Sequence, residues 1–558
     1  MSVWQYPLGA RPCNEPSREA PVTADKVLIL GLDGATLDVV APWARAGALP
    51  AFADLLDKGA SGPLRSTLPP VTPQAWPSVY TGTNAGKHGI FGFEKRLPGS
   101  YGWAKSSAAD LARPPLWELA AREGVRSGLF FLPYVYPTTE MNGWVVAGRG
   151  APGGLRPHLS WPRELAGELA GRFGEAALFG ERRPVGWSIR QIAEALVDSV
   201  RQQTDAMVWA IKKGSFDLVF GVWDQPDTAA HLLWHFSEQP CPPPDSPLAA
   251  VYRAVDDGIA RLRDAMGGDP LVIVCSDHGA YPIRWKLRVP SWLAQQGMLS
   301  SSTSFGARAV AVATRAWNST PAIVRRHIPS KARDMAHAAH KQTITQNTSV
   351  DWPRTRVYPE PISAEAFRLN LQGREPDGCV PVAAAPETIA ELTRMLRELE
   401  APDGSALVEG VVDNAAAYNG PLADRGPDLI AELSYGTYFS PTASRPLISA
   451  PARPSLDDPP ASLGYHHPDG LVIVAGPGVA PGNISASVTD LAPTVLRNLG
   501  VAIPVDLDGT AIEEAFVALP EVAWTEAEPD LWRPEGTGLT EGEEQEIAQR
   551  LRDLGYLD

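Results

Sequence analysis

The chain has 558 residues, of which 44% are hydrophobic and 20% are charged, and its formal net charge is −15. This composition predicts a globular protein with a large core, built either as several domains or as one α/β enzyme domain with insertions. The acidic balance argues against a nucleic-acid polymer as the main partner, because phosphate backbones are bound by basic surfaces. Small anionic substrates held by metal ions remain compatible with it.

The cysteines and the N-terminal segment bear on the compartment. No paired spacing connects the four cysteines, which indicates neither a disulfide framework nor a zinc knuckle; they are Cys13, Cys241, Cys275 and Cys379. Residues 1–25 are expected to form a flexible leader without the apolar segment of a secretory signal. No uninterrupted apolar run approaches the ~20 residues of a membrane span. We therefore expect a soluble, cytoplasmic protein.

The first predicted element is a buried strand that ends in an acidic turn. Lys26–Leu32 is a continuous apolar run, as expected of a parallel strand covered on both faces, and Asp33 and Gly34 follow it. Ligands of open α/β sheets gather at the carboxyl ends of strands, which makes Asp33 a candidate binding residue. An Asp-Gly pair that only turns the chain is the alternative.

A proline-rich loop then surrounds one hydroxyl, that of Thr72. Pro69, Pro70 and Pro73 hold the backbone extended or turned, and we expect a helix to begin just after Pro73. The Thr72 hydroxyl would then lie at a helix N-terminus, where backbone N–H groups favour an anion. Thr72 is either a capping residue or a nucleophile, and a nucleophile needs a group that lowers the proton affinity of its hydroxyl.

Two further buried strands carry polar groups at their carboxyl ends. Before them the sequence predicts a helix at Pro115–Arg122, a strand at Gly128–Leu132 and helical segments without recognisable chemistry over residues 151–215. The two strands are Asp217–Trp223, followed by Asp227 and His231, and Pro270–Cys275, followed by Asp277 and His278. Asp227 and His231 share one face if helical and can then hold one ion, or they are an N-cap and a surface histidine. Asp277 and His278 are either a ligand pair or part of a turn.

Residues 285–360 interrupt the strand–helix alternation and are predicted to form an inserted, mainly helical cap. Within this region Ser301–Lys341 contains seven Arg and Lys residues against one acid, Asp334. The basic segment either attracts an anionic substrate, lies on a membrane surface, or is a solvated helical face that pairs with acidic surface elsewhere.

The alternation resumes after the insertion. The predicted elements are a helix at Glu387–Glu400, a strand at Asp428–Leu433, a polar loop at Gly464–Gly470, a strand at Leu471–Ala475, a helix at Asp490–Gly500, and a final helix from a Thr540–Glu543 capping box to near Gly555. His466 and His467 in the polar loop either supply a ligand or are ordinary loop residues. We expect a catalytic domain over 26–516, with the insertion inside it, and a tail over 517–558.

These motifs together predict a metal site. The candidate ligands are Asp33, Asp227, His231, Asp277, His278 and His466. Such a set suits borderline divalent cations, zinc first, and is enough for two ions. Two ions roughly 4 Å apart stabilise both the attacking and the leaving oxygen of an in-line displacement at phosphorus, and one of them can activate Thr72.

The order of the motifs resembles the alkaline phosphatase superfamily. The resemblance rests on Gly31–Gly34, the Thr72 loop with Tyr80–Gly82 and Gly86–Phe91, Asp227 with His231, Ser276–Gly279 and Gly464–His466. The closest likeness is to the type I phosphodiesterase/nucleotide pyrophosphatase branch, including bacterial phosphohydrolase- and phosphomutase-like proteins. It extends from Lys26 to about Phe516 and implies an α/β fold with a central, mostly parallel sheet flanked by helices.

The resemblance also implies roles for the candidate residues. One divalent ion, Zn²⁺ or alternatively Mn²⁺ or Mg²⁺, would be held by Asp33, Thr72, Asp277 and His278, and a second by Asp227, His231 and His466. His466 is preferred to His467 because related proteins have the ligand histidine two residues after the glycine. Thr72 would attack phosphorus, and water would then hydrolyse the phosphothreonine.

One position departs from the family pattern. Eukaryotic nucleotide pyrophosphatases have an asparagine three residues after the nucleophile, where this chain has Ala75. We expect Gln74, or a helix-terminal N–H, to contact the phosphoryl oxygen instead. Lys87 and His88 are expected to have structural roles, with His88 as a general acid the alternative.

The sequence thus predicts a hydrolase of small anionic phosphoesters, with diesters or nucleotides favoured over monoesters. The alternatives are a phosphomonoesterase, a phosphotransferase, a sulfatase-like hydrolase and a non-catalytic metal-binding relative. A sulfatase would need a modified Cys or Ser followed by Pro and Arg, and Thr72-Pro-Gln-Ala-Trp76 lacks both the residue and the arginine. The residues do not specify the substrate, the metal or the oligomeric state.

Overall fold

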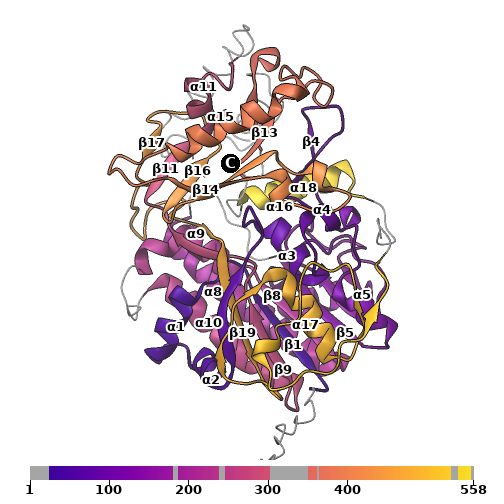
Figure 1. Ribbon diagram of the computed structural model, residues 1–558. Helices are drawn as coiled ribbons and strands as arrows, with labels where there is room; N and C mark the ends of the chain where they lie inside the picture. The colour runs from indigo at the N-terminus through magenta and orange to yellow at the C-terminus, as the bar shows by residue number, and fades with distance from the viewer. Residues whose placement is uncertain are drawn as a thin grey trace, which may run out of the picture.

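The computed structural model describes residues 24–179, 187–237, 246–301, 350–360, 363–528 and 538–553. A ten-stranded sheet forms the centre of the larger lobe, with the order β20-β2-β19-β9-β1-β8-β5-β6-β7 and with β21 beside β2 (Figure 1). Its strands are β1 (Val27–Leu32), β2 (Ala60–Arg65), β5 (Ser127–Leu132), β6 (Gly143–Ala147), β7 (Ser160–Trp161), β8 (Leu218–Trp223), β9 (Leu271–Cys275), β19 (Asp469–Ala475), β20 (Gly482–Asn483) and β21 (Ala486–Ser487).

The middle of this sheet is parallel. Strands β9, β1, β8, β5 and β6 run in one direction, and β19 is antiparallel to both β9 and β2. The strands β1, β8 and β9 are fully buried, as their continuous apolar runs predicted. Because parallel strands end at the same edge of a sheet, five carboxyl ends face one side of the lobe.

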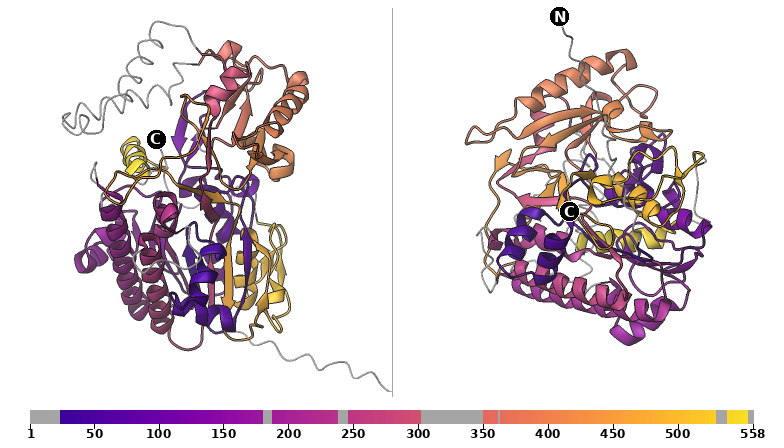
Figure 2. Two further views of the ribbon diagram at one scale, coloured as in Figure 1. Left: turned by 90° about the vertical axis from the view of Figure 1, so that its left-hand side faces the viewer. Right: turned by 60° about the horizontal axis from the view of Figure 1, so that its bottom comes forward.

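Helices cover both faces of the sheet, as the two views in Figure 2 show. One layer contains α1 (Leu37–Arg45), α2 (Pro50–Lys58), α8 (Ile189–Gly214) and α10 (Pro247–Met266). The opposite layer contains α3 (Thr72–Thr81), α5 (Leu116–Arg122) and α17 (Leu491–Asn498). The predicted α/β fold, with a mostly parallel central sheet between helices, is therefore confirmed.

A second, smaller lobe lies above the first in Figure 1 and has a hydrophobic core of its own. It contains a three-stranded sheet of β16 (Thr437–Ser440), β11 (Trp285–Arg288) and β17 (Ile448–Ser449), and a four-stranded sheet of β12 (Val357–Pro359), β13 (Ala366–Leu369), β15 (Leu429–Leu433) and β14 (Val408–Asp413). Helices α11 (Val289–Gln295) and α15 (Ala385–Arg397) pack on these sheets.

The mainly helical insertion was expected over residues 285–360, of which the structure describes 285–301 and 350–360. The smaller lobe is mixed α/β in its described residues and continues to Ser449. The basic segment lies outside the described residues apart from Ser301. The predicted domain boundaries stay predictions.

The remaining elements connect or flank the two lobes. They are α4 (Ala85–His88), β3 (Glu94–Arg96), β4 (Trp103–Lys105), α6 (Leu165–Phe173), α7 (Ala176–Phe179), α9 (Gln225–Leu233), β10 (Gly279–Pro282), α16 (Asn414–Ala417), β18 (Gly464–His467), β22 (Ile503–Pro504), β23 (Trp524–Thr525) and α18 (Glu541–Asp553). The expected capping box precedes α18, since Thr540 N donates to Glu543 Oε2 at 2.9 Å and Glu543 N to Thr540 Oγ1 at 3.4 Å. Across the described ranges, no helix is both long and apolar enough to cross a bilayer.

Candidate active site

The carboxyl edge of the parallel strands brings the predicted polar residues together. Asp33 follows β1, Asp227 lies in α9 after β8, and Asp277 and His278 follow β9. His466 reaches the same place from β18, which pairs with β10. Buried side chains make up most of this set; Asp33, Thr72, Asp227, Asp277 and His278 have no exposed surface, and His466 is 7% exposed.

Thr72 is the first residue of α3. Val71 is extended and acts as the N-cap, so the helix begins one residue before Pro73 rather than after it. The Thr72 hydroxyl donates to Asp33 Oδ1 at 3.2 Å, and its oxygen is 3.3 Å from His278 Nε2. Its side chain therefore does not cap the helix but points toward the ends of β1 and β9.

Asp33, Asp277 and His278 form a first cluster beside Thr72. His278 Nε2 is 3.7 Å from Asp33 Oδ1 and 3.4 Å from Asp277 Oδ2. Its Nδ1 faces the Gly279 carbonyl at 3.0 Å, and because a carbonyl only accepts, Nδ1 carries the proton and Nε2 a lone pair. Asp277 Oδ2 is buried and receives no hydrogen bond from the described residues. Such an oxygen is expected to face a cation or an ordered water.

Asp227, His231 and His466 form a second cluster. Asp227 Oδ1 is 3.4 Å from His231 Nε2 and 3.7 Å from His466 Nε2, and the two histidine nitrogens are 3.0 Å apart. His231 Nδ1 faces the Gly464 carbonyl at 2.8 Å, so the His231 Nε2 lone pair points at the cluster. Two nitrogens facing each other at this distance need a proton or a cation between them.

The structure places His466 in the site, rather than His467. Alternate residues of β18 point to opposite faces, and the ring of His466 stacks on His278 with centroids 4.0 Å apart. His467 is on the other face, where its Nδ1 accepts a hydrogen bond from Asp469 N at 3.0 Å. The polar loop expected here is in fact a strand, and its pairing with β10 fixes the position of His466.

Burial favours the uncharged form of both the carboxyls and the imidazoles of the site. A protonated carboxyl binds a cation poorly, whereas a neutral imidazole binds one well. Burial raises the pKa of Asp33 to about 7, against the opposing charge of Arg149, and it raises the pKa of Asp277 well above the ordinary value. It lowers the pKa of His278 to about 4 and holds the pKa of His466 well below its ordinary value. The histidines are therefore neutral at pH 7, and the carboxyls need a nearby positive charge to ionise fully.

Arg149 is a buried charged residue of the site that sequence reasoning missed. It follows β6, its side chain is 1% exposed, and its guanidinium lies 3.3–3.5 Å from carboxylate oxygens of Asp33, Asp224 and Asp227. Burial lowers the pKa of Arg149, but these carboxylates raise it above the usual arginine value. The available signal was the run Trp144–Ala147 followed by Gly-Arg-Gly, which repeats the pattern of a buried strand with a polar group at its carboxyl end.

Two glycines allow this close packing. Gly34 has φ +69° and a Cβ there would lie 2.8 Å from Asp227, so only glycine fits between the two acidic turns. A Cβ on Gly31 would lie 2.5 Å from the ring of Trp76, whose Nε1 donates to Asp33 Oδ2 at 3.1 Å. Both glycines thus serve the placement of Asp33.

The donor atoms suit divalent cations. The ligand atoms of Asp33, Asp277 and His278 lie within 4.8 Å of one another, as do those of Asp227, His278 and His466. Carboxylate oxygens and neutral imidazole nitrogens are the ligands of zinc and related borderline ions. The unbonded Asp277 oxygen and the facing nitrogens of His231 and His466 fit cations in both clusters.

The side chain of Gln74 contacts the loop before Thr72. Its amide nitrogen donates to the Leu68 carbonyl at 3.1 Å, and its oxygen accepts from the Tyr418 hydroxyl at 3.3 Å. These contacts brace the loop, and the expected contact of Gln74 with a phosphoryl oxygen stays a prediction.

His88 and Lys87 have structural partners, as expected. His88 Nε2 is 3.0 Å from Ser78 Oγ on α3, and its Nδ1 accepts from Ile90 N. Burial lowers the pKa of His88 to about 3, which does not suit a general acid at neutral pH. Lys87 Nζ pairs with Asp508.

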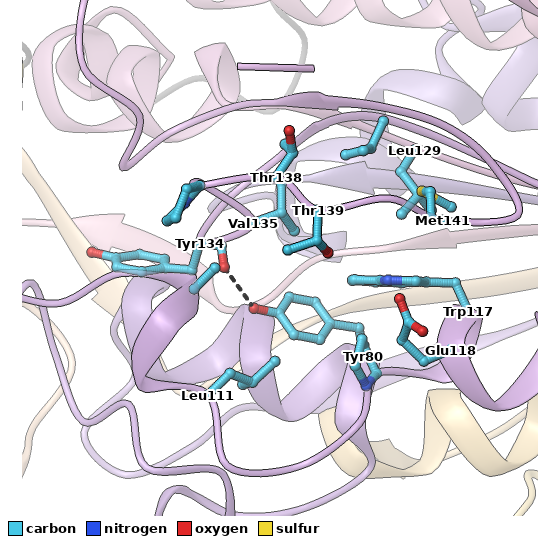
Figure 3. Close-up of a pocket in the computed structure, with 14 residues that line it drawn as sticks. Tyr80, Leu111, Trp117, Glu118, Leu129, Tyr134, Val135, Thr138, Thr139 and Met141 are labelled. Atoms are coloured by element: carbon cyan, nitrogen blue, oxygen red, sulfur yellow. Dashed lines mark hydrogen bonds between the residues drawn. The ribbon is translucent and has the colours of Figure 1, made fainter. Parts of the chain in front are cut away.

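A separate, mainly apolar pocket lies beside α3 (Figure 3). It is lined by residues that include Tyr80, Trp117 and Met141, and Tyr80 Oη donates to the Tyr134 carbonyl at 3.4 Å. None of the candidate ligands lines this pocket. It is therefore distinct from the polar site.

Most of the chain matches one known protein family. The model of the type I phosphodiesterase / nucleotide pyrophosphatase family matches residues 27–446. The chain belongs to this family. Membership confirms the resemblance seen in the motif order and identifies an enzyme that hydrolyses phosphoric ester bonds. The matched range ends before His466, whose place in the site rests on the geometry alone.

Solved structures with low sequence identity also match. Murine ectonucleotide pyrophosphatase / phosphodiesterase 5 is 14% identical, with 86% of this chain and 95% of the mouse chain covered and a TM-score of 0.45. An inactive variant of the same mouse protein in complex with AMP has a TM-score of 0.46, again at 14% identity with 86% and 95% covered. Phosphonoacetate hydrolase from Sinorhizobium meliloti 1021 in complex with phosphonoacetate is 14% identical, with 85% and 97% covered and a TM-score of 0.48. No curated protein matches the chain.

Proposed function

We propose that the protein is a phosphodiesterase that cleaves a small phosphoester through a phosphothreonine on Thr72, with two divalent cations, zinc first. The observation that carries this proposal is the position of the Thr72 hydroxyl, 3.2 Å from Asp33 Oδ1 and 3.3 Å from His278 Nε2 at the N-terminus of a buried helix. A hydroxyl with a purely structural role has no need of an acidic and an imidazole partner that each belong to a cation-binding cluster.

The two clusters divide the ligands in the proposed site. Asp33, Thr72, Asp277 and His278 would hold one cation, and Asp227, His231 and His466 would hold the other. When bound, the cations supply positive charge to the phosphoryl oxygens and lower the proton affinity of the Thr72 hydroxyl and of water.

The protein groups then account for two successive displacements at phosphorus. Thr72 Oγ1, oriented by its hydrogen bond to Asp33, forms the new bond to phosphorus while the bond to the leaving alcohol breaks and the alcohol takes up a proton. Water next attacks the phosphothreonine: its oxygen forms the new bond to phosphorus, the bond from phosphorus to Thr72 Oγ1 breaks, one water proton goes to Thr72 Oγ1, and a phosphate monoester is released. The buried walls around Thr72 keep other nucleophiles away from the intermediate.

The finer parts of this assignment stay proposals. They include zinc as the metal, the preference for diesters over monoesters, a cytoplasmic location and the absence of a nucleic-acid polymer as substrate. Since Ala75 has no side-chain donor and the Gln74 amide donates to the Leu68 carbonyl, we assign no side chain to the phosphoryl oxygen.

Substitution of Thr72 tests the proposal directly. We expect Thr72→Ala to lower turnover of bis(p-nitrophenyl) phosphate by about 10³-fold or more, and Thr72→Ser to retain part of it because the hydroxyl is kept. Thr81→Ala is the matched control, since Thr81 is a buried threonine on the same helix whose hydroxyl donates to the Pro77 carbonyl. Full activity in Thr72→Ala would exclude Thr72 as the nucleophile.

A substrate panel separates the alternatives. Wild-type protein is assayed with a phosphodiester, a phosphomonoester and a sulfate ester of p-nitrophenol after its metal content is measured. Faster turnover of the monoester or the sulfate ester would contradict the diesterase assignment. Bound metal without turnover of any ester would identify a non-catalytic relative.

A further inference from the structure

Arg149 has no part in the reaction proposed above, yet it contacts both cation-binding clusters. Its Nη1 atom is 3.5 Å from Asp33 Oδ2 and 3.4 Å from Asp227 Oδ2. Asp33 belongs to the first cluster and Asp227 to the second. A single guanidinium nitrogen therefore lies between one carboxylate of each site.

The oxygens of these two carboxylates are divided between the arginine and the cation side. Asp33 Oδ1 accepts from Thr72 and is near His278, whereas Asp33 Oδ2 faces Trp76 and Arg149. In the same way Asp227 Oδ1 faces the histidines of its cluster, whereas Asp227 Oδ2 faces Arg149. Contact with Arg149 thus turns the Oδ1 atoms of both carboxylates toward the positions of the cations.

The rest of the guanidinium is anchored on the segment that carries Asp227. Arg149 Nη2 donates to the Asp224 carbonyl at 3.1 Å and is 3.3 Å from Asp224 Oδ2, and Nε is 3.4 Å from the same oxygen. Asp224 directly precedes α9 and Asp227 lies in its first turn. This fork-shaped contact is one that lysine, with a single ammonium, does not reproduce.

Arg149 also changes the net charge of the proposed two-cation site. The four carboxylates of Asp33, Asp224, Asp227 and Asp277 carry −4, and Arg149 reduces this to −3. Two divalent cations would bring the total to +1, a suitable value for an anionic ester.

We infer that Arg149 is a positioning residue that couples the two cation sites, by holding Asp33 and Asp227 in one fixed arrangement through their outer oxygens. This inference rests on the proposed two-cation site. Because the same side chain orients one ligand of each site, its loss weakens both sites together. A residue that served only packing would leave the cation affinities unchanged.

Zinc titration of the whole protein tests this. Metal-free wild type, Arg149→Met and Arg149→Lys are titrated with Zn²⁺ against a chromophoric chelator, after circular dichroism has shown that each variant is folded. We expect two ions in wild type, and in both variants a 10- to 100-fold loss of affinity at each site, which is the usual effect of removing a residue that orients metal ligands. Arg149→Lys keeps the charge, so its loss of affinity reports orientation.

Arg368→Met is the matched control. Arg368 is also buried, with its guanidinium bonded to Glu360 and to the Arg425 and Gly426 carbonyls in the smaller lobe. We expect this variant to bind two zinc ions with wild-type affinity.

Two results would overturn the inference while leaving the proposed function intact. One is wild-type affinity at both sites in Arg149→Lys, and the other is a loss confined to a single site. If Arg149→Met fails to fold, Arg149→Lys alone decides between these results. Failure of the wild type to bind any zinc would sink the proposed function, and with it this inference.

Discussion

Metal-free protein should become less stable as the pH rises, because its buried carboxyls are protonated in the folded chain and ionise in the unfolded chain. Burial raises the pKa of Asp33 from 3.8 to about 7. Below pH 3.8 this carboxyl is protonated in both the folded and the unfolded chain, and its contribution to stability is complete. Between pH 3.8 and 7 the unfolded chain ionises while the folded chain stays protonated, so metal-free protein loses stability as the pH rises.

The size of the loss follows from the shift. A difference of roughly 3 pKa units at 1.36 kcal/mol per unit corresponds to about 4 kcal/mol, reached at about pH 7. With an unfolding entropy of about 2.1 cal/mol/K per residue, this lowers Tm by about 3–4 °C for a chain of this length. Asp277, whose pKa is raised further by burial and by Asp33, acts in the same direction.

Thermal denaturation at pH 5, 6, 7 and 8, with chelator and with saturating Zn²⁺, measures the effect. The cations take the place of the protons, so we expect the difference in Tm between loaded and metal-free protein to grow with pH. Asp33→Asn should reduce this growth. Asp256→Asn is the control and should leave this growth unchanged. Burial also raises the pKa of Asp256, but this carboxyl lies outside the site, where it accepts hydrogen bonds from Phe52 N and Ala51 N. A difference in Tm that is the same at all four pH values would refute the reasoning.

Two further substitutions probe the geometry of the site. His231→Ala should remove one of two bound zinc ions as measured by metal analysis, whereas His467→Ala, whose side chain lies on the other face of β18, should keep both; the opposite pattern would show that the wrong histidine had been assigned. Gly34→Ala should lower zinc affinity and destabilise the fold by about 1–3 kcal/mol, because φ is +69° and the added Cβ would lie 2.8 Å from Asp227. Gly47→Ala has a similar φ of +78° with no atom within 4 Å, so it should show the backbone strain without the loss of zinc.

The sequence was sufficient for the parts of the site that continuously apolar, buried strands position. Strands β1, β8 and β9 are covered on both faces, and their continuous apolar runs could be recognised without an alignment. The polar residues after them could be assigned to one edge, because parallel strands share the direction of their carboxyl ends. Asp33 and His278 were found in this way.

Other features of the site and of the smaller lobe could not be predicted from the sequence. Arg149 follows β6, a buried strand of five residues like β9, but it was missed because a single arginine in a loop is usually exposed. In the smaller lobe the sequence predicted the helix and the strand that became α15 and β15, but not the sheet that joins β12, β13, β15 and β14, because the paired strands are far apart in the sequence. The hydrogen bond of the Gln74 amide to Leu68 could not be predicted, because it depends on a loop conformation that no local pattern reports.

His466 shows how one register determines the chemistry of the whole edge. Strand β18 pairs antiparallel with β10, with Ala280 opposite His466. A slip of one residue would turn His466 away and bring His467 toward Asp227, since the side chains of a strand alternate between its two faces. The stacking of His466 on His278 and its 3.0 Å approach to His231 exist only in the observed register. The histidine that completes the second cluster is thus selected by a strand pairing outside the main sheet, so the site depends on β10 and β18 as much as on the parallel strands.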